Sequence, residues 1–150
     1  MPKVPFNYQN TVIYKIVCKD LNIEDVYVGH TTNFTKRKCA HKNNSKNPNG
    51  KEYGHKIYKT IREYGGFENW SMIEIEKYPC NDLQEESKKE RYYFELLNAK
   101  LNTNFPSRGI NEYKENNKFE LKMYNKKYQE KHKNEIQEYQ NMYKVKHKNI

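Results

Sequence analysis

The run TVIYKIVC, residues 11–18, constrains the fold more than any other segment of this chain. A β-strand through it would carry apolar side chains on both faces, with Tyr14 and Ile16 on one and Ile13 and Val17 on the other. A strand that is apolar on both faces belongs in the middle of a sheet that is covered on both sides. We therefore predict a central strand here, with other layers packed against each of its faces.

Two further apolar runs predict the rest of the sheet. The short run at residues 26–29 follows a polar turn at residues 19–25, and two such runs joined by a short loop predict a β-hairpin. The hairpin places Tyr14 and Tyr27 on neighbouring strands. Residues 70–76 alternate between polar and apolar side chains, which predicts a third, half-exposed strand.

Three helices are predicted around these strands. Asn33 suits the N-cap of a helix that runs to about residue 43, and residues 57–64 carry a helical apolar stripe that two glycines stop. Asp82 with Glu85 three residues later resembles a capping box that opens the third helix. The expected class is therefore α+β, with a small three-stranded, mainly antiparallel sheet flanked by helices.

The pattern changes after residue 109. Residues 120–134 and 135–149 align at a 15-residue period, rich in Lys, Glu and Gln, with tyrosines spaced by four. Such a repeat predicts a helix with a weak aromatic stripe and no core of its own. We divide the chain into an N-terminal extension (1–10), a folded domain (11–109) and a basic Lys/Tyr-rich helical tail (110–150).

The charge of the chain favours polyanionic partners. The net charge is +9, of which residues 1–110 carry +5 (18 basic and 13 acidic side chains) and residues 111–150 carry +4 (10 and 6). Lysines and arginines bind phosphates and release counterions, so nucleic acid is the expected partner. The tail is also open to a protein partner or self-association. The three cysteines show no paired spacing, and neither a signal peptide nor a membrane-length apolar run is present, so we expect a soluble, intracellular protein without a membrane partner.

One carboxylate stands out in the third predicted helix. Its inward stripe comprises Leu83, Ser87, Glu90, Phe94 and Leu97. A buried carboxylate is costly unless it is paired or bound to a metal ion. Three explanations therefore stay open for Glu90: a salt bridge to a nearby Arg or Lys, an acidic side chain tolerated at the edge of the stripe, and a metal site.

Several motifs in order resemble a known family. VIY at residues 12–14 is followed by YVG at 27–29, by TTNFTKRKCAHK with Arg37 and His41 one helical turn apart, and by IREYGG and ERYYFELLNAKLNTN. In this order the motifs resemble the GIY-YIG endonucleases, and the resemblance covers about residues 11–106. Each tripeptide alone is a weak signal, but the joint order is specific.

The resemblance implies a metal-dependent endonuclease that hydrolyses DNA phosphodiester bonds. It implies that Tyr14 and Tyr27 are tyrosines of the catalytic face and that Gly29 permits close approach at the strand end. Arg37 would face the scissile phosphate, where its forked donors could clamp the non-bridging oxygens. His41 would lie beside it and supply a proton or a phosphate hydrogen bond.

The resemblance also assigns the metal. Glu90 would bind one divalent cation, Mg²⁺ or Mn²⁺, and an asparagine shortly after its helix would contribute to substrate binding. Asn98, Asn102 and Asn104 compete for that place, and Asn102 is favoured. A tyrosine, with Tyr14 favoured, would deprotonate the attacking water, although an unperturbed phenol titrates near ~10 and needs nearby positive charge or a metal to do so.

Simpler interpretations remain for the same residues. Tyr14 and Tyr27 could form an ordinary cross-strand aromatic pair. Arg37 and His41 could belong to a solvated basic helix face, and Gly29 could simply end a strand. The alternative function is a noncatalytic module that binds nucleic acid or protein on the same fold. Some members have a further histidine between the two middle helices, but His55 is offset from that position and is not assigned a role.

Overall fold

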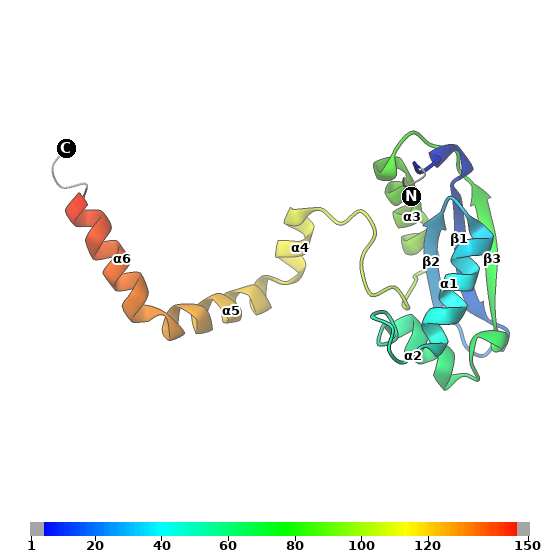
Figure 1. Cartoon of the computed structure of the whole chain (residues 1–150), viewed down its shortest axis with the longest axis horizontal. Coiled ribbons are helices and arrows are strands. Elements are labelled where there is room, and N and C mark those ends of the chain that lie inside the picture. Colours follow the sequence, from blue (N-terminus) through cyan, green and yellow to red (C-terminus); the bar gives the residue numbers. More distant parts are fainter. Residues whose placement is uncertain (1–4, 147–150) are drawn as a thin grey trace. The chain divides into compact units, whose positions relative to one another are not determined.

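The computed structural model of the chain describes residues 5–146, so residues 1–4 of the predicted extension and 147–150 of the tail lie outside it. Three strands, β1 (Val12–Cys18), β2 (Val26–Thr31) and β3 (Trp70–Lys77), form one sheet in the order β2-β1-β3. Both pairings are antiparallel, and β1 lies in the centre (Figure 1). The predicted class and the predicted central strand are confirmed.

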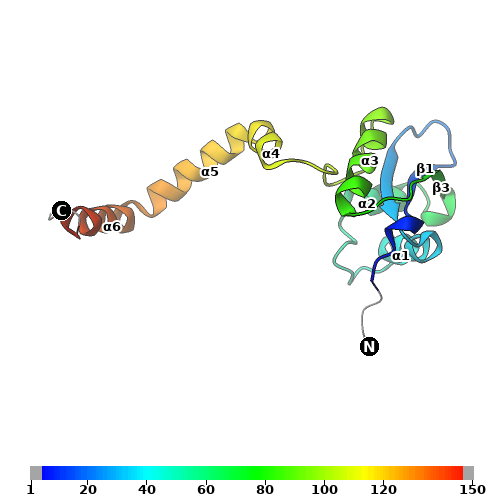
Figure 2. The ribbon, with the colours of Figure 1, turned by 90° about the horizontal axis from the view of Figure 1, so that it is seen from above.

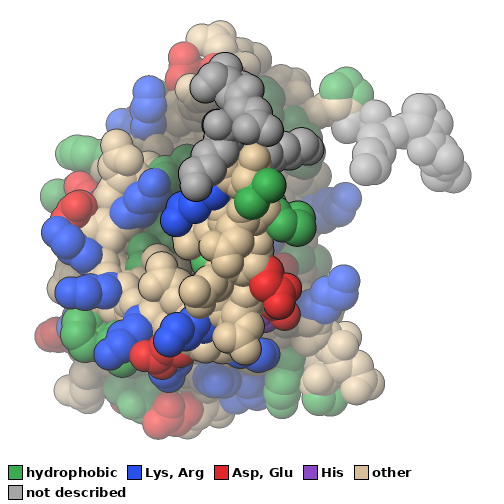
Figure 3. Space-filling model, turned by 90° about the vertical axis from the view of Figure 1, so that its left-hand side faces the viewer, with side chains coloured by type: hydrophobic (Ala, Val, Ile, Leu, Met, Phe, Trp, Pro, Cys, Tyr) green, Lys and Arg blue, Asp and Glu red, His purple; other side chains and the backbone are tan. Residues whose placement is uncertain are grey.

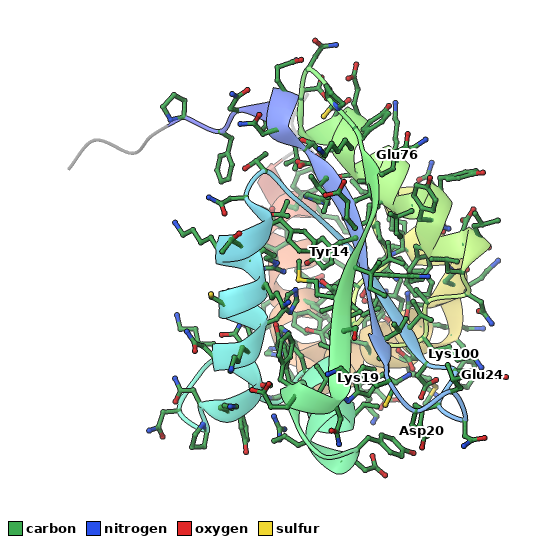
Figure 4. All side chains as sticks on the ribbon, turned by 90° about the vertical axis from the view of Figure 1, so that its right-hand side faces the viewer. Tyr14, Lys19, Asp20, Glu24, Glu76 and Lys100 are labelled. Carbon is green, nitrogen blue, oxygen red and sulfur yellow. The ribbon has the colours of Figure 1, made fainter. Side chains whose placement is uncertain are left out.

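Helices cover both faces of this sheet. Helix α1 (Phe34–Lys46) lies on one face and α3 (Leu83–Leu96) on the other (Figures 2 and 4). Helix α2 (Lys56–Glu63) packs on the same side as α1. Two short 3-10 turns, Tyr8–Asn10 before β1 and Phe67–Asn69 before β3, complete the N-terminal unit. The result is a three-layer arrangement in which both faces of β1 are buried.

The alternation in β1 divides the core into two clusters. Tyr14 and Ile16 pack on the α2 side, against Ile57 and Ile61. Ile13, on the opposite face of β1, joins a second cluster that includes Val28 and partly buried residues of α3. Burial of apolar side chains on both faces fixes the register, because a slip of one residue would exchange the two faces.

Side-chain caps explain why α1 and α3 begin where the sequence predicted. The side chain of Asn33 accepts a hydrogen bond from the Lys36 N–H at 2.9 Å, and that of Asp82 accepts one from the Glu85 N–H at 2.9 Å. The reciprocal half of the predicted capping box differs, because the Glu85 carboxylate accepts from the N–H of Asn81. These caps satisfy backbone donors that a helix start leaves unpaired.

The outer edge of β2 is covered by the segment that follows α3. The side-chain amide of Asn102 accepts from the Val28 N–H at 3.0 Å and donates to the Val28 carbonyl at 2.7 Å. The Leu101 N–H donates to the Val26 carbonyl at 3.1 Å. This segment thus takes the place of a neighbouring strand, which protects an edge that would otherwise expose unpaired backbone groups.

The described chain divides into two compact units, one that ends at residue 107 and a C-terminal unit that starts at residue 108. The C-terminal unit contains α4 (Ile110–Asn116), α5 (Lys118–Lys131) and α6 (Lys133–Lys146). The tail is helical as predicted, but the two repeats do not form one continuous helix. They give two separate helices, α5 and α6, whose first residues are 15 positions apart, as the repeat period requires. No helix within residues 5–146 has the length and apolar character needed to cross a membrane.

Candidate active site

Two cavities open at the edge of the sheet formed by β2. The first has a volume of about 520 Å³ and extends toward α3 and the N-terminal extension, and the second, of about 260 Å³, extends toward α2 and the segment after α3. Tyr27, Arg37 and Glu90 line both cavities. Three of the residues singled out from the sequence therefore meet at one place, although they come from β2, α1 and α3.

Behind them lies a buried hydrogen-bond network centred on Tyr14. Its side chain is fully buried between β1 and α1 (Figure 4). Its hydroxyl accepts from Nε of Arg37 at 3.0 Å and lies 2.8 Å from Nε2 of His41, whose Nδ1 lies 2.9 Å from the Tyr58 hydroxyl. Neither Tyr14 nor His41 lines either cavity. Tyr14 contacts two residues that line the cavities, Arg37 and Tyr27, and His41 contacts Tyr27.

Burial and the charge of Arg37 together set the ionisation states of Tyr14, Tyr27 and Arg37. Burial raises the pKa of Tyr14 well above its usual value and also raises the pKa of Tyr27, while the charge of Arg37 acts in the opposite direction on both. Burial of Arg37 favours its neutral form, but its interactions with the two phenols outweigh this and raise its pKa. Without a substrate, the site therefore presents one fixed cation beside two neutral phenols.

His41 should make folding sensitive to acid. Burial, together with the charge of Arg37, lowers its pKa from 6.5 to about 3. The unfolded chain then binds a proton at a higher pH than the folded chain, so stability is lost as the pH falls below 6.5. We expect a loss of about 2 kcal/mol between pH 7 and pH 5 from this group, measured by urea unfolding. The His41→Gln variant should show a pH dependence weaker by that amount, and an identical dependence would contradict the assignment.

Gly29 lies against the Tyr14 side chain, and its role in substrate binding stays a prediction. A Cβ at this position would lie 2.5 Å from the Tyr14 hydroxyl oxygen and 2.6 Å from its Cζ. Because Tyr14 is fully buried, it has no free space into which to move. Gly29→Ala should therefore lower the free energy of unfolding by about 1–3 kcal/mol, as measured by thermal unfolding.

Gly54→Ala is the matched control for that substitution. A Cβ on Gly54 meets no atom within 4 Å. Its effect should stay within about 0.5 kcal/mol. Equal effects of the two substitutions would show that the contact with Tyr14 does not restrict position 29.

Glu90 is buried, with an exposed fraction of 9%, and its partner is a histidine rather than a lysine or arginine. Oε2 of Glu90 contacts Nδ1 of His30, and Nε2 of His30 lies 3.4 Å from Oε2 of Glu86. Burial of His30 disfavours its charged form, yet the hydrogen bond to Glu90 and the two carboxylate charges outweigh burial and raise its pKa. Pairing with His30 therefore already compensates the burial of Glu90.

The second cavity holds the asparagines and a further histidine. Asn102 and Asn104 line it, as does His55. The side-chain amide of Asn102 is engaged at both ends by Val28, so this residue holds the edge of β2. Its role as a substrate ligand stays a prediction, and Asn104 and His55 are both exposed at the same cavity.

Sequence reasoning missed His30 and Glu86. Two signals were present. His30 lies two residues from Val28, so strand alternation turns it to the α3 face, and Glu86 lies one helical turn before Glu90. Neither residue was recognised, because the predicted stripe of the third helix passed through Leu83 and Ser87 instead. Leu83 is exposed in the structure.

Fold and site together define a small α+β domain with a tyrosine, arginine and glutamate site at an edge strand. A family model described as the GIY-YIG catalytic domain matches residues 10–105, well over half of the chain. The chain therefore belongs to the GIY-YIG nuclease family. A search of curated proteins and a search of solved structures found no match.

Proposed function

We infer that the chain is a metal-dependent endonuclease that hydrolyses phosphodiester bonds in DNA. The observation that carries this proposal is the convergence of Tyr27, Arg37 and Glu90 on both cavities at the β2 edge. Phosphodiester hydrolysis needs an activated water, a cation for the phosphoryl oxygens and stabilisation of the leaving oxygen. A phenol, a guanidinium and a carboxylate suit these three tasks.

The role of each site residue is assigned from its access to the two cavities. Arg37 uses Nε to hold Tyr14, also interacts with the Tyr27 phenol, and lines both cavities, where its guanidinium can bind a phosphate. Tyr27 lies at the cavity and is partly exposed, so it is better placed than the buried Tyr14 to meet the attacking water. His41 holds Tyr14 from behind and acts as a positioning residue.

Glu90 fits a divalent cation by its position and chemistry. Within residues 5–146, no three His, Cys, Asp or Glu side chains are arranged to hold a metal ion by themselves. Mg²⁺ is commonly held by one or two carboxylates, with waters and phosphate oxygens completing the shell. A Mg²⁺ or Mn²⁺ ion on Glu90 would polarise the phosphate and stabilise the leaving oxygen.

The test is cleavage of supercoiled plasmid DNA with Mg²⁺, with Mn²⁺ and with EDTA. Nicked or linear product with metal, and none with EDTA, supports the proposal. Sequencing the ends cut from a randomised library would add the end chemistry and the sequence preference. Binding of DNA without cutting, across metals and pH values, would instead establish the noncatalytic binding module.

The C-terminal unit is proposed to bind the DNA backbone. Residues 111–150 have a net charge of +4. Lysine and arginine side chains are spread widely over the surface of the chain shown in Figure 3. The repeat tyrosines Tyr124, Tyr128 and Tyr139 are more than half exposed, so lysines and phenolic hydroxyls are both accessible. Both groups are common phosphate contacts that carry little sequence information.

Removing charge from this unit should weaken DNA binding and reduce its dependence on salt. We expect the triple variant Lys122→Gln, Lys126→Gln and Lys127→Gln in α5 to lower the slope of log affinity against log salt concentration. The reduction should be about 0.9 for each lysine that contacts a phosphate. Fluorescence anisotropy with a labelled duplex at several salt concentrations measures it.

A control with uncharged substitutions separates charge from helix disturbance. Gln129→Ala, Gln137→Ala and Gln140→Ala alter the same unit without changing its charge. The control should keep the wild-type salt slope. An unchanged slope in the lysine variant would point to a protein partner or self-association for this unit.

A further inference from the structure

Two residues beside the proposed metal ligand have no role in the chemistry described so far. His30 follows the YVG tripeptide and lies on the face of β2 that packs against α3. Glu86 lies on α3, one turn before Glu90. Glu86 is buried, with only 3% of its surface exposed. A charged group in such a place needs partners to offset its desolvation.

The partners form a continuous chain of contacts. Oε1 of Glu86 accepts a hydrogen bond at 3.1 Å from the hydroxyl of Thr11, which is itself buried. Nε2 of His30 lies 3.4 Å from Oε2 of Glu86, and Nδ1 of His30 contacts Oε2 of Glu90. The imidazole is thus held between two carboxylates on successive turns of one helix.

This arrangement leaves one oxygen of Glu90 available. The contact with His30 uses Oε2, and no hydrogen bond to Oε1 is present among residues 5–146. Because the two nitrogens of His30 face different carboxylates, the three side chains do not converge on one point as ligands would. They instead fix the direction in which the Glu90 carboxylate faces the cavity.

We propose that His30 is a positioning residue for Glu90, anchored in turn by Glu86, and that it holds Oε1 of Glu90 toward a divalent cation. The inference rests on the proposed function, since it assumes that Glu90 binds the metal. Partners that orient a ligating carboxylate contribute strongly to metal affinity, and their loss lowers metal affinity or activity by about 10–100-fold.

Mn²⁺ binding to the full chain, followed by the electron paramagnetic resonance signal of free Mn²⁺, tests the proposal without relying on cleavage. His30→Ala should weaken Mn²⁺ binding by at least about tenfold and lower kcat for plasmid cutting, with KM for DNA unchanged. His30→Asn should restore affinity to within a few-fold, because its amide N–H takes the place of Nδ1. Glu86→Gln should cause a smaller loss in the same direction, and it keeps the test valid if His30→Ala does not fold.

The control is a second histidine–glutamate pair. Nδ1 of His132 lies 2.9 Å from Oε2 of Glu135 in the C-terminal unit. His132→Ala should leave Mn²⁺ affinity unchanged. Wild-type affinity in folded His30→Ala, or equal losses in His30→Ala and His30→Asn, would overturn the role of His30 alone. Failure of the wild-type chain to bind Mn²⁺ would overturn both the proposed metal dependence and this role.

Discussion

Replacing Glu90 by glutamine is expected to lower the rate of metal-dependent DNA cutting by about 10³-fold while DNA affinity changes little. A metal that neutralises charge on the phosphoryl oxygens contributes several kcal/mol to the transition state, and each 1.36 kcal/mol corresponds to about tenfold in rate. The amide keeps the volume of the carboxylate and can still contact His30, so the fold should persist. Single-turnover cleavage, duplex binding and thermal unfolding measure the three quantities separately.

Glu74→Gln provides the control for this substitution. Glu74 is exposed on β3 and lines neither cavity, so the same chemical change there should leave cutting at the wild-type rate. Cutting by Glu90→Gln within about fivefold of wild type would exclude Glu90 as the metal ligand. Parallel loss of cutting and of DNA binding would show that the charge of Glu90 supports the fold or the DNA interface instead.

The sequence was sufficient for the fold wherever the signal is local. Alternation in residues 11–18 identified the central strand, and Asn33 and Asp82 marked two helix starts because a cap depends only on neighbours within one turn. The breaks in the tail at Asn117 and His132 were missed. Repeat length alone does not show whether two repeats form one continuous helix or two.

The site was predictable only as a set of residue types. That Glu90 lies on an inward face followed from helix periodicity, but its partner His30 is 60 residues away in sequence and became visible only with the packing of α3 on β2. Asn102 shows the same limit, because a side chain that caps a sheet edge looks like any polar loop residue in sequence. Long-range contacts decided which of the polar residues face the cavity.

The two tyrosines differ in their access to the cavities, because Tyr27 lines both and Tyr14 is fully buried. Removing the hydroxyl of Tyr27 should therefore mainly lower activity, whereas removing that of Tyr14 should mainly lower stability. Tyr27→Phe deletes the hydroxyl that lies at the cavities and should reduce kcat by at least about 10²-fold with little change in stability. Tyr14→Phe deletes a buried acceptor from Nε of Arg37 and leaves Nε2 of His41 without its partner, while Nδ1 of His41 keeps the Tyr58 hydroxyl. It should lower the free energy of unfolding by about 1–3 kcal/mol and reduce kcat less.

Single-turnover cleavage rates and urea unfolding of both variants separate these effects. Tyr27→Phe should change the cleavage rate, whereas Tyr14→Phe should change the buried hydrogen bonds to Arg37 and His41. Both variants lose one oxygen atom and keep the ring, so packing is matched. If Tyr14→Phe loses more of kcat than Tyr27→Phe and keeps its stability, the buried tyrosine would be the base, as its place in the first tripeptide suggested. The proton removed from the water would then have to reach Tyr14 through Tyr27, which lines both cavities, since Tyr14 itself is not exposed.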